Sequence, residues 1–535
     1  MNASAAAATH ATQGADQIDR DRYDIVVVGA GHNGLVAANY FRRSGLSVIV
    51  LEKASGVGGN AVTVEPLLAG FHHNPHANYL AFCDLMPMMQ DFSLREGGLE
   101  LTFPEAQFGV AFSDGRPPVI LHRQDLLDRT FASFRAYSKK DARTYLELKR
   151  RSATLASIIR RGLYTSPNRE WFAEQRHAVQ LTFGDMCSRN SIGSRTARQL
   201  IDELFRAAEV RMLLYLLAMD CGIAIEEVGG DLGFLGLALW IGGRWRLPVG
   251  GMQSVSNAIY RSAAEADVVV RCGRRVHRVL LDNNKAIGVL NDDGSLIYAD
   301  KAVVGAIPIP TLMFELLDSQ SLSAQEQSEL HRFEGEQNVG SIATSMFCLN
   351  QRPHYKSSRY DAAIDQCFKT TIGYDSPEDV LKSAADNSVG LLPSPAGTIR
   401  LNTLWDLSQA PQDMHIAGVD SVFPAVSCMD TETWRRVEES FAGAFFDVWG
   451  RYTDNLDLAS NLGMRCDALA RFERRMLLRL GGSAYRTSIE KLYMCGPGTY
   501  PGGGVHGANG YNAFHVVMDD LGAQTSFTLG REASS

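Results

Sequence analysis

The feature that most constrains the fold is the stretch from Tyr23 to Thr63, near the start of the chain. Its residues Ile25 to Val28 form an unbroken β-branched run, which is typical of a buried parallel strand, and the sequence GAGHNG from Gly29 to Gly34 follows directly. Leu35 to Ser44 has the composition of a helix, and a second apolar strand then leads to Glu52. This order of strand, glycine turn, helix, strand and acid predicts a Rossmann-type dinucleotide-binding unit.

Each glycine of the turn has a separate purpose in such a unit. Gly29 would permit the tight turn, Gly31 would let a pyrophosphate approach the backbone at the helix N-terminus, and Gly34 would let the helix pack closely on the strand. Glu52 lies about twenty residues beyond the glycines, where it can accept hydrogen bonds from an adenosine ribose. A glycine-rich turn without function is the alternative, and the flanking strand, helix and acid argue against it.

Two further segments distinguish FAD from NAD. Gly58-Gly59 follows the acid, and the stretch from Lys491 to Gly510 (KLYMCGPGTYPGGGVHGANG) gives a second strand, glycine-rich turn and helix near the C-terminus. Together with the first stretch, they resemble the phytoene desaturase-like flavoprotein family, which includes carotenoid desaturases and the pyridine nucleotide-disulfide oxidoreductase domain 2 proteins. The resemblance continues at Pro248 to Met252 (PVGGM) and at Ala299 to Pro308 (ADKAVVGAIP). A weaker match occurs at Thr403 to Ala410 (TLWDLSQA), and Tyr485-Arg486-Thr487 also fits.

The resemblance implies an α/β fold, with a discontinuous Rossmann-type FAD-binding domain, an α+β substrate domain and a helical cap insertion. We expect residues 22–66, 247–312 and 484–528 to form the FAD-binding domain, and residues 67–246 and 313–483 to form the substrate and cap domain. Residues 1–21 contain Ala, Thr, Gln and Asp without an apolar run, so we expect a disordered tail rather than a signal peptide.

The resemblance also implies a set of FAD contacts at the two ends of the chain. These residues are Gly29, Ala30, Gly31, His32, Asn33, Gly34, Glu52, Lys53, Gly58, Gly59, Asn60, Ala61, Val276, Gly496, Gly503, Gly504, His506, Gly507 and Asn512. In such flavoproteins the N–H groups that start the last helix face the flavin N1–C2=O end, which becomes anionic on reduction.

Two departures from the family pattern are visible. Gly56 and Asn60 stand where many relatives carry arginines beside the glycine pair. The sequence FHHNPH from Phe71 to His76 replaces the Phe-Asp-x-Gly-Pro type segment that carotenoid desaturases usually carry. Because this segment passes near flavin and substrate in the family, the second departure argues against the usual carotenoid substrate.

Four residues are candidates for catalysis, namely His506, His73, His76 and Tyr79. His506 could donate a hydrogen bond to the flavin or assist proton transfer, or it could only fill space and bond to the backbone. His73 and His76 could line the active site or be ordinary loop histidines, and Tyr79 could donate a proton or serve in packing. We expect no metal site, because Pro75 breaks the helix that a histidine pair at i and i+4 would need.

Composition narrows the function further. The net charge of -8 and the lack of a basic domain argue against nucleic acid. Nine cysteines without a CxxC pair exclude a redox-active dithiol and suit a reducing cytoplasm. No apolar run is long enough to span a bilayer. The basic groups Lys149-Arg150-Arg151 and Arg160-Arg161 suit either peripheral docking on an anionic membrane or a solvated helix face.

We therefore expect an FAD-dependent oxidoreductase (a desaturase, dehydrogenase or oxidase) that takes a hydride from a largely apolar, lipophilic or aromatic substrate. Only one dinucleotide fingerprint is visible, so we expect oxygen or a quinone to reoxidise the flavin. Two alternatives stay open: a flavin amine oxidase that produces hydrogen peroxide, and a non-redox flavoprotein such as an isomerase or an assembly factor. The sequence indicates neither the substrate's identity nor the oligomeric state.

Overall fold

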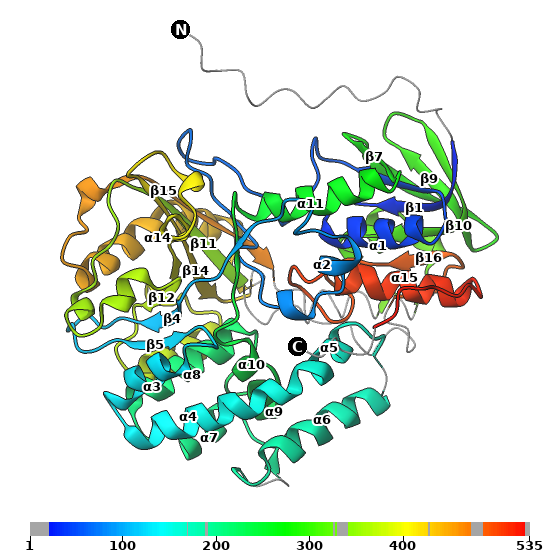
Figure 1. The fold of residues 1–535 in the computed structure, drawn as a ribbon. Coiled ribbons are helices and arrows are strands. Elements are labelled where there is room, and N and C mark those ends of the chain that lie inside the picture. Colours follow the sequence, from blue (N-terminus) through cyan, green and yellow to red (C-terminus); the bar gives the residue numbers. More distant parts are fainter. Residues whose placement is uncertain are drawn as a thin grey trace.

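A computed structural model describes residues 21–167, 169–187, 191–324, 327–328, 341–425, 428–471 and 485–529. The predicted tail over residues 1–21 lies outside the described residues except for its last one. Figure 1 shows two sheet-containing bodies side by side, with a layer of helices beneath them. Each sheet collects strands from separated parts of the chain.

The first sheet has the strand order β7-β2-β1-β10-β9-β8, and β16 also pairs with β10. Its strands are β1 (Arg22–Val28), β2 (Val48–Glu52), β7 (Val269–Cys272), β8 (Val276–Asp282), β9 (Lys285–Asn291), β10 (Leu296–Gly305) and β16 (Leu492–Met494). The strands β7, β2, β1, β10 and β16 run parallel, whereas β9 and β8 are antiparallel. All seven lie within the three segments expected for the FAD-binding domain, and the complete domain division stays a prediction.

The length of β10 joins the small antiparallel set to the parallel part of this sheet. Leu296 to Tyr298 pairs with β9, and from Tyr298 to Gly305 the same strand pairs with β1. Ala299 to Gly305, within the ADKAVVGAIP stretch, lies in this parallel part.

Three helices lie together on the first sheet (Figure 1). α1 (His32–Arg43) lies between α11 (Met252–Glu265) and α15 (Ala508–Asp520) and contacts both. Glycines allow these close contacts: a Cβ on Gly34 would lie 2.2 Å from the Gly29 carbonyl oxygen, and one on Gly510 would lie 2.3 Å from the Asn33 carbonyl oxygen. The packing of α1 therefore accounts for the glycine at position 34, as the sequence predicts.

The second sheet has the order β15-β11-β14-β13-β12-β4-β5. Its strands are β4 (Ala106–Val110), β5 (Val119–His122), β11 (Ser341–Leu349), β12 (Lys369–Ile372), β13 (Gly397–Arg400), β14 (His415–Phe423) and β15 (Asn461–Arg471). β4 and β5 form an antiparallel hairpin, with Gly115 at φ +67° in its connection. The apolar face of this sheet packs against α14 (Thr431–Tyr452), and α13 (Pro377–Ser388) follows β12.

The helices of the cap insertion that the resemblance implies form the lower layer in Figure 1. Its helices are α3 (Leu127–Arg135), α4 (Lys139–Ser152), α5 (Ala156–Leu163), α6 (Arg169–Phe183), α7 (Ala197–Leu204), α8 (Ala208–Asp220), α9 (Gly230–Gly233) and α10 (Leu239–Ile241). The remaining short elements are α2 (Met88–Asp91), β3 (Leu101–Thr102) and β6 (Leu247–Pro248), and β3 pairs with β6.

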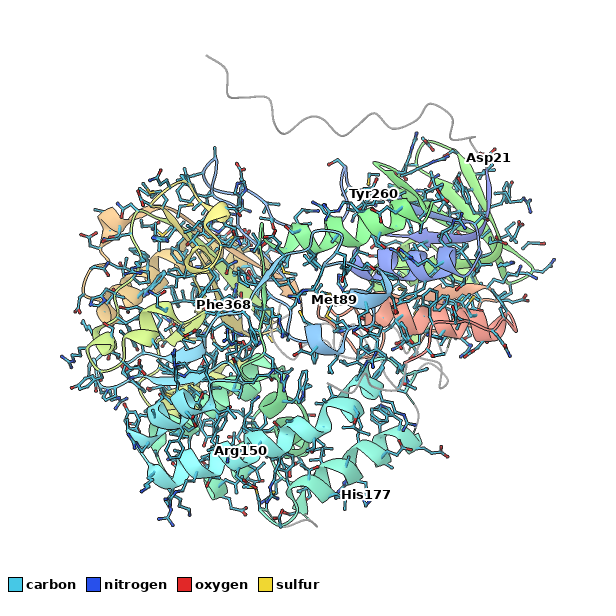
Figure 2. The ribbon with its side chains drawn as sticks, in the orientation of Figure 1. Asp21, Met89, Arg150, His177, Tyr260 and Phe368 are labelled. Carbon is cyan, nitrogen blue, oxygen red and sulfur yellow. The ribbon has the colours of Figure 1, made fainter. Side chains whose placement is uncertain are left out.

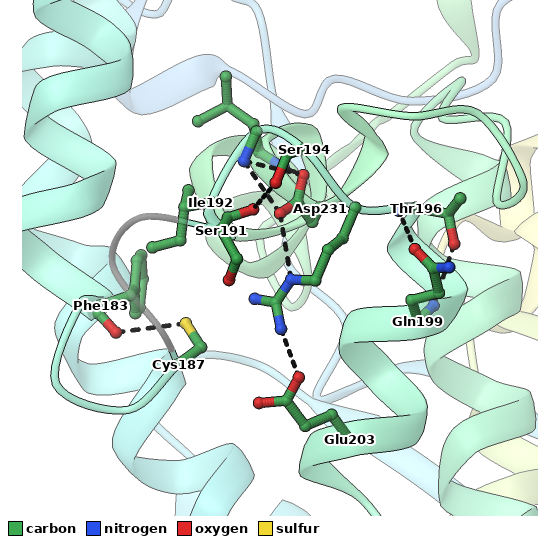
Figure 3. Close-up of polar contacts among 12 residues, drawn as sticks. Phe183, Cys187, Ser191, Ile192, Ser194, Thr196, Gln199, Glu203 and Asp231 are labelled. Carbon is green, nitrogen blue, oxygen red and sulfur yellow. Dashed lines mark hydrogen bonds and ion pairs between the residues drawn. The ribbon is translucent and has the colours of Figure 1, made fainter.

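A buried carboxylate ties the connection before α7 to α9 (Figure 3). Asp231 is fully buried and accepts hydrogen bonds from the Gly193 N–H at 3.0 and 3.1 Å. Arg195 lies 3.8 Å from the same carboxylate and also pairs with Glu203 of α7. Thr196 caps α7 by accepting from the backbone of that helix, so polar contacts fix the position of this part of the cap.

The three basic residues at the end of α4, Lys149, Arg150 and Arg151, do not all lie on the surface as the sequence suggested. Lys149 points inward, and its Nζ donates to the carbonyl oxygens of Leu239 at 2.6 Å and Trp240 at 3.0 Å, and to that of Gly242. Arg151 pairs with Glu147 and Asp185. Arg150, labelled in Figure 2, is exposed on α4. Treating Lys149 as a surface cation is therefore wrong, because this lysine caps the C-terminal end of α10.

Within the described part of the chain, no helix combines the length and the apolarity that crossing a bilayer requires.

Candidate cofactor and substrate site

The glycine turn between β1 and α1 is shaped partly by packing and partly by open space. Gly29 has φ +103°, and a Cβ on it would lie 2.8 Å from the Ala306 carbonyl oxygen. Gly31 has an extended backbone with φ -66°, and a Cβ there would have one neighbour within 4 Å, the Gly59 Cα at 3.9 Å. Protein contacts therefore explain the glycine at position 29 but not the one at position 31, where the missing side chain leaves room for a ligand.

The N-terminus of α1 opens on the same turn. Gly31 gives the helix no side-chain cap, and its first turn contains no acidic residue. Asn33 is buried, and its Oδ1 has no hydrogen-bond partner among the described residues. An uncapped helix N-terminus favours an anion, and a buried amide oxygen without a partner favours a ligand that donates to it.

Glu52 holds the turn from the end of β2. The Ala30 N–H donates to its Oε2 at 2.7 Å, and the Ala54 N–H donates to its Oε1 at 2.9 Å. The carboxylate is therefore fixed beside the glycine turn, at the edge where the parallel strands end.

The Gly58-Gly59 pair lies on the first glycine turn. The Gly58 N–H donates to the Ala30 carbonyl oxygen at 2.9 Å, and Gly58 forms a β-bridge with Gly31. Both members have positive φ, +132° and +58°, and a Cβ on Gly59 would lie 3.2 Å from the Gly31 Cα. Backbone conformation and close approach together require glycine at this pair.

The C-terminal glycine turn meets the N-terminal one through His32. Its Nε2 donates to the Gly504 carbonyl oxygen at 3.1 Å. Desolvation lowers the pKa of His32 to about 4, so the ring is neutral at physiological pH. Gly503 resembles Gly31, because a Cβ on it would meet nothing within 4 Å and its φ lies outside the left-handed region. The structure thus joins the two turns and leaves space at both.

His506 caps the last helix. The ring is 2% exposed, and its Nδ1 accepts from the Ala508 N–H at 3.1 Å. Because a backbone N–H can only donate, Nδ1 carries no proton and Nε2 carries the ring proton. The Tyr164 hydroxyl donates to the His506 carbonyl oxygen at 2.7 Å, and Gly507, the N-cap residue before α15, has φ +67°. His506 is fixed as a donor at Nε2, beside Gly504.

Other residues predicted to bind the cofactor lie inside the protein. The Asn512 amide donates at 2.9 Å to the Leu163 carbonyl oxygen and to the Tyr485 hydroxyl, and the residue is 2% exposed. A Cβ on Gly496 would lie 2.3 Å from the Ile307 carbonyl oxygen, so the close packing of the segments that follow β16 and β10 accounts for that glycine. The contacts of both residues are thus made to protein atoms.

Val276 is buried in the core of the first sheet. The chain just before it lies beside the acid, because the Arg274 N–H donates to the Glu52 carbonyl oxygen at 2.8 Å. Lys53 is exposed, and Ala61 is buried with its carbonyl oxygen bound by Ser256.

Asn74 joins three stretches that the sequence singles out. Its Oδ1 accepts from the Met252 N–H at 2.9 Å and from the Thr63 hydroxyl at 2.7 Å, and its Nδ2 donates to Gln409 Oε1 at 3.1 Å. A Cβ on Gly251 would lie 2.3 Å from Thr63 Oγ1. The PVGGM and TLWDLSQA stretches therefore anchor the loop that carries the three histidines.

His73 contacts the second sheet. It is 1% exposed, and its Nε2 is 3.6 Å from the Cys348 Sγ on β11. Desolvation, with repulsion from His72 as the smaller cause, lowers the pKa of His73 to about 4. Its ring packs against the second sheet, so the structure favours packing over catalysis for His73.

His76 is exposed on the same loop, next to two carboxylates of the second sheet. Partial desolvation lowers the pKa of His76, and Asp467 and Asp420 partly offset this effect. The next residue, Ala77, donates its N–H to the Asn60 carbonyl oxygen at 3.3 Å. His76 therefore lies between the glycine-pair loop and the second sheet.

Tyr79 contacts charged residues that sequence reasoning missed. Lys369 of β12 donates to its hydroxyl at 3.0 Å and pairs with Asp220 at the end of α8. Lys369 and Arg400 are register partners on β12 and β13, and each is 1% exposed. One available signal was the presence of single cations in short, otherwise uncharged strands, where burial demands a partner.

Among the residues that the structure describes, no three His, Cys, Asp or Glu side chains gather in a way that could hold a metal ion.

Comparison with known proteins places the chain. A family model described as "Flavin containing amine oxidoreductase" matches residues 34–353, which is more than half of the chain. The chain belongs to this family. A limonene dehydrogenase subunit from Castellaniella defragrans is 25% identical over 94% of this chain and 96% of its own. Pyridine nucleotide-disulfide oxidoreductase domain-containing protein 2 from mouse is 24% identical over 96% of both chains, which confirms the resemblance stated above.

Solved structures confirm the fold class. An oxidoreductase from Methanosarcina mazei superposes with a TM-score of 0.60 at 14% identity, over 92% of this chain and 99% of its own. As a flavin-containing amine oxidoreductase, the chain is an FAD-dependent enzyme of the oxidoreductase class. FAD fits the residues present, since the space at Gly31 and Gly503 and the uncapped start of α1 suit a pyrophosphate and a ring between the two turns.

Proposed function

We propose that the enzyme takes a hydride from a lipophilic organic substrate held between the glycine-pair loop and the second sheet. One contact carries this placement. The hydrogen bond from the Ala77 N–H to Asn60 brings the loop of His76 and Tyr79 onto the cofactor side. Tyr79 packs there against Trp245 and Phe368, with ring centres 6.2 and 5.9 Å away, so aromatic surface adjoins the cofactor loop.

The relatives support an apolar substrate. The limonene dehydrogenase of Castellaniella defragrans bears the name of a hydrocarbon substrate, and its matching subunit aligns with this chain along nearly its whole length. Bound FAD would accept the hydride, and the chain would hold FAD through Glu52, the Gly31 turn and the start of α15. His506, with its proton on Nε2, would donate to the flavin or its substrate.

We further propose oxygen or a quinone as the electron acceptor. Among the described residues, one glycine turn of the dinucleotide-binding type is followed by a helix and by an acidic residue that could bind a ribose. In our proposal FAD occupies this unit. A nicotinamide nucleotide would need a second such unit.

Amine oxidation is the second candidate, and one observation favours it. Asp420 presents a carboxylate that is 30% exposed, beside His76, and Arg400 and Thr344 hold it in place. A carboxylate in that position could bind a substrate ammonium group. Peroxide release from amines would support this reaction.

The test is reduction of the bound flavin without air. Purified protein is mixed anaerobically with a panel of terpenes, polyenes, phenols and amines, and the flavin absorbance is followed. We expect one apolar class to bleach the flavin and air or a quinone to restore it. Bleaching by amines alone would establish the second candidate, and a flavin that no compound reduces would contradict the redox proposal.

A further inference from the structure

The Lys369 ammonium lies in an aromatic enclosure at the substrate side of the second sheet. Its Nζ is 4.4 Å from the ring centre of Tyr79, 4.6 Å from that of Trp245 and 5.5 Å from that of Phe108. The residue is 1% exposed. Phe368, labelled in Figure 2, precedes Lys369 in the chain and also packs on Tyr79. A charge so deeply buried must be paired, and here Asp220 pairs with it.

The Lys369 side chain stays charged in this enclosure. Desolvation acts to lower its pKa, but Asp220 and Tyr79 outweigh desolvation, and the pKa of Lys369 is raised. The ammonium therefore acts on the Tyr79 hydroxyl as a full positive charge at physiological pH.

The Tyr79 hydroxyl has a proton to donate. An ammonium group carries three donors and no acceptor, so the tyrosine oxygen accepts from Lys369 and its own proton points elsewhere. Within the described chain, this accepted bond is the one hydrogen bond in which the Tyr79 hydroxyl takes part. Desolvation, followed by Asp220, raises the pKa of Tyr79 to about 12, so the phenol keeps its proton.

The position of Tyr79 relative to the cofactor loop is fixed by its neighbours. Ala77 is bound to Asn60, and Leu80 exchanges two backbone hydrogen bonds of 2.9 Å with Arg246. Tyr79 lies between these anchors, within about 7 Å of Ala77 along an extended chain. The Tyr79 side chain is half-buried, and its hydroxyl bonds to the buried Lys369 ammonium.

We propose that the Tyr79 hydroxyl donates a hydrogen bond to a carbonyl oxygen of the substrate, so that the natural substrate is an oxygenated lipophile and not a pure hydrocarbon. This inference rests on the proposed function and refines its substrate class. A partly buried donor without an acceptor is unfavourable until a ligand supplies one. The neighbouring cation strengthens the donor, and the surrounding rings supply apolar contact for the carbon skeleton.

The test compares ligands that share a carbon skeleton. Limonene with carvone, and cyclohexane with cyclohexanone, differ in the carbonyl group. Binding to the FAD-loaded protein is measured without air from perturbation of the flavin absorbance. We expect each ketone to bind about tenfold more tightly than its hydrocarbon, because a charge-assisted donor loses its partner in the hydrocarbon complex.

Tyr79→Phe removes the hydroxyl and keeps the ring. In this variant we expect the ketone preference to fall to about one, with FAD content unchanged. Tyr137→Phe is the matched control, since its hydroxyl donates at 2.5 Å to the Pro117 carbonyl oxygen, outside this enclosure. The control should keep the full preference.

Equal binding of ketones and hydrocarbons by the unmodified protein, no binding of any ketone, or a preference that survives Tyr79→Phe would each overturn the inference. The readout is binding, so its failure is distinct from that of the proposed function. A flavin that no compound reduces counts against the redox proposal and leaves the binding ratio measurable.

Discussion

At the scale of single residues, the glycines of the first turn have different reasons. Packing explains Gly29 and Gly34, but it does not explain Gly31. Positions 29 and 34 require glycine because a Cβ would collide with the backbone or with Ala306. Position 31 has an ordinary backbone conformation and free space, and we propose that its glycine serves the approach of FAD.

Gly31→Val should therefore fold but lose FAD. An added Cβ would have one neighbour within 4 Å, the Gly59 Cα at 3.9 Å, so the substitution begins in open space at the start of α1. We expect the free energy of unfolding of the FAD-free variant to lie within about 0.5 kcal/mol of that of the FAD-free unmodified protein. Gly34→Val is the contrasting control and should itself destabilise the fold. Stoichiometric flavin absorbance in purified Gly31→Val would show that the pyrophosphate does not lie there.

Glu52→Gln should weaken FAD binding without removing the side chain. The carboxylate accepts from Ala30 and Ala54 and is aligned at the end of β2. Loss of a charge-assisted hydrogen bond to the ribose should cost about 1.5 to 3 kcal/mol of binding free energy. Titration of the FAD-free protein measures the change, and an unaltered Kd would remove Glu52 from the ribose.

The buried His73 should make the free energy of unfolding sensitive to acid. Its folded-state pKa of about 4 lies below the ordinary value of 6.5, so the folded protein binds fewer protons than the unfolded chain between these pH values. The contribution of His73 is complete above pH 6.5 and falls progressively as the pH drops to 4, by about 3 kcal/mol in all.

The measurement is the free energy of unfolding in urea at pH 7 and at pH 4.5. His73→Leu should lose less stability between the two pH values than the unmodified protein. His277→Leu is the control, because His277 lies 61% exposed on β8. Identical losses in His73→Leu and the unmodified protein would refute the assignment.

At the scale of elements, the structure shows which features a sequence can reveal. The β1, α1 and β2 unit and the start of α15 were predictable because each follows from a local order of strand, glycine turn and helix. The enclosure of Lys369 was not, because β12, α8 and the Tyr79 loop meet only in the folded chain. For the same reason the sequence did not reveal that Lys149 is buried. The helix that it caps, α10, begins ninety residues further along the chain.

Lys149→Met tests this inward cap. The substitution keeps an unbranched side chain one atom shorter, but leaves the carbonyl oxygens of Leu239, Trp240 and Gly242 without their donor. We expect a loss of about 1 to 3 kcal/mol in the free energy of unfolding. Arg150→Ala, on the exposed side of α4, should change it by less than about 0.5 kcal/mol. Equal effects of the two substitutions would contradict the cap.

At the scale of the whole molecule, the two sheets are connected by loops that contact both of them. We propose that the first sheet and its two glycine turns hold the cofactor, and that the second sheet supplies aromatic and charged side chains to the substrate site. Asn74, Met252 and Gln409 fix the connecting loop at the junction. This arrangement explains why an FAD-dependent oxidoreductase uses segments from nearly the entire chain for one site.

The most direct test is the identity and amount of nucleotide released when the purified protein is denatured. The account predicts FAD at about one per chain, either as purified or after loading with FAD and removal of the excess. Loss of that FAD in Gly31→Val, with the fold retained, would place it at the two glycine turns. A protein that holds no FAD even after loading, or that holds a nicotinamide nucleotide instead, would contradict the account.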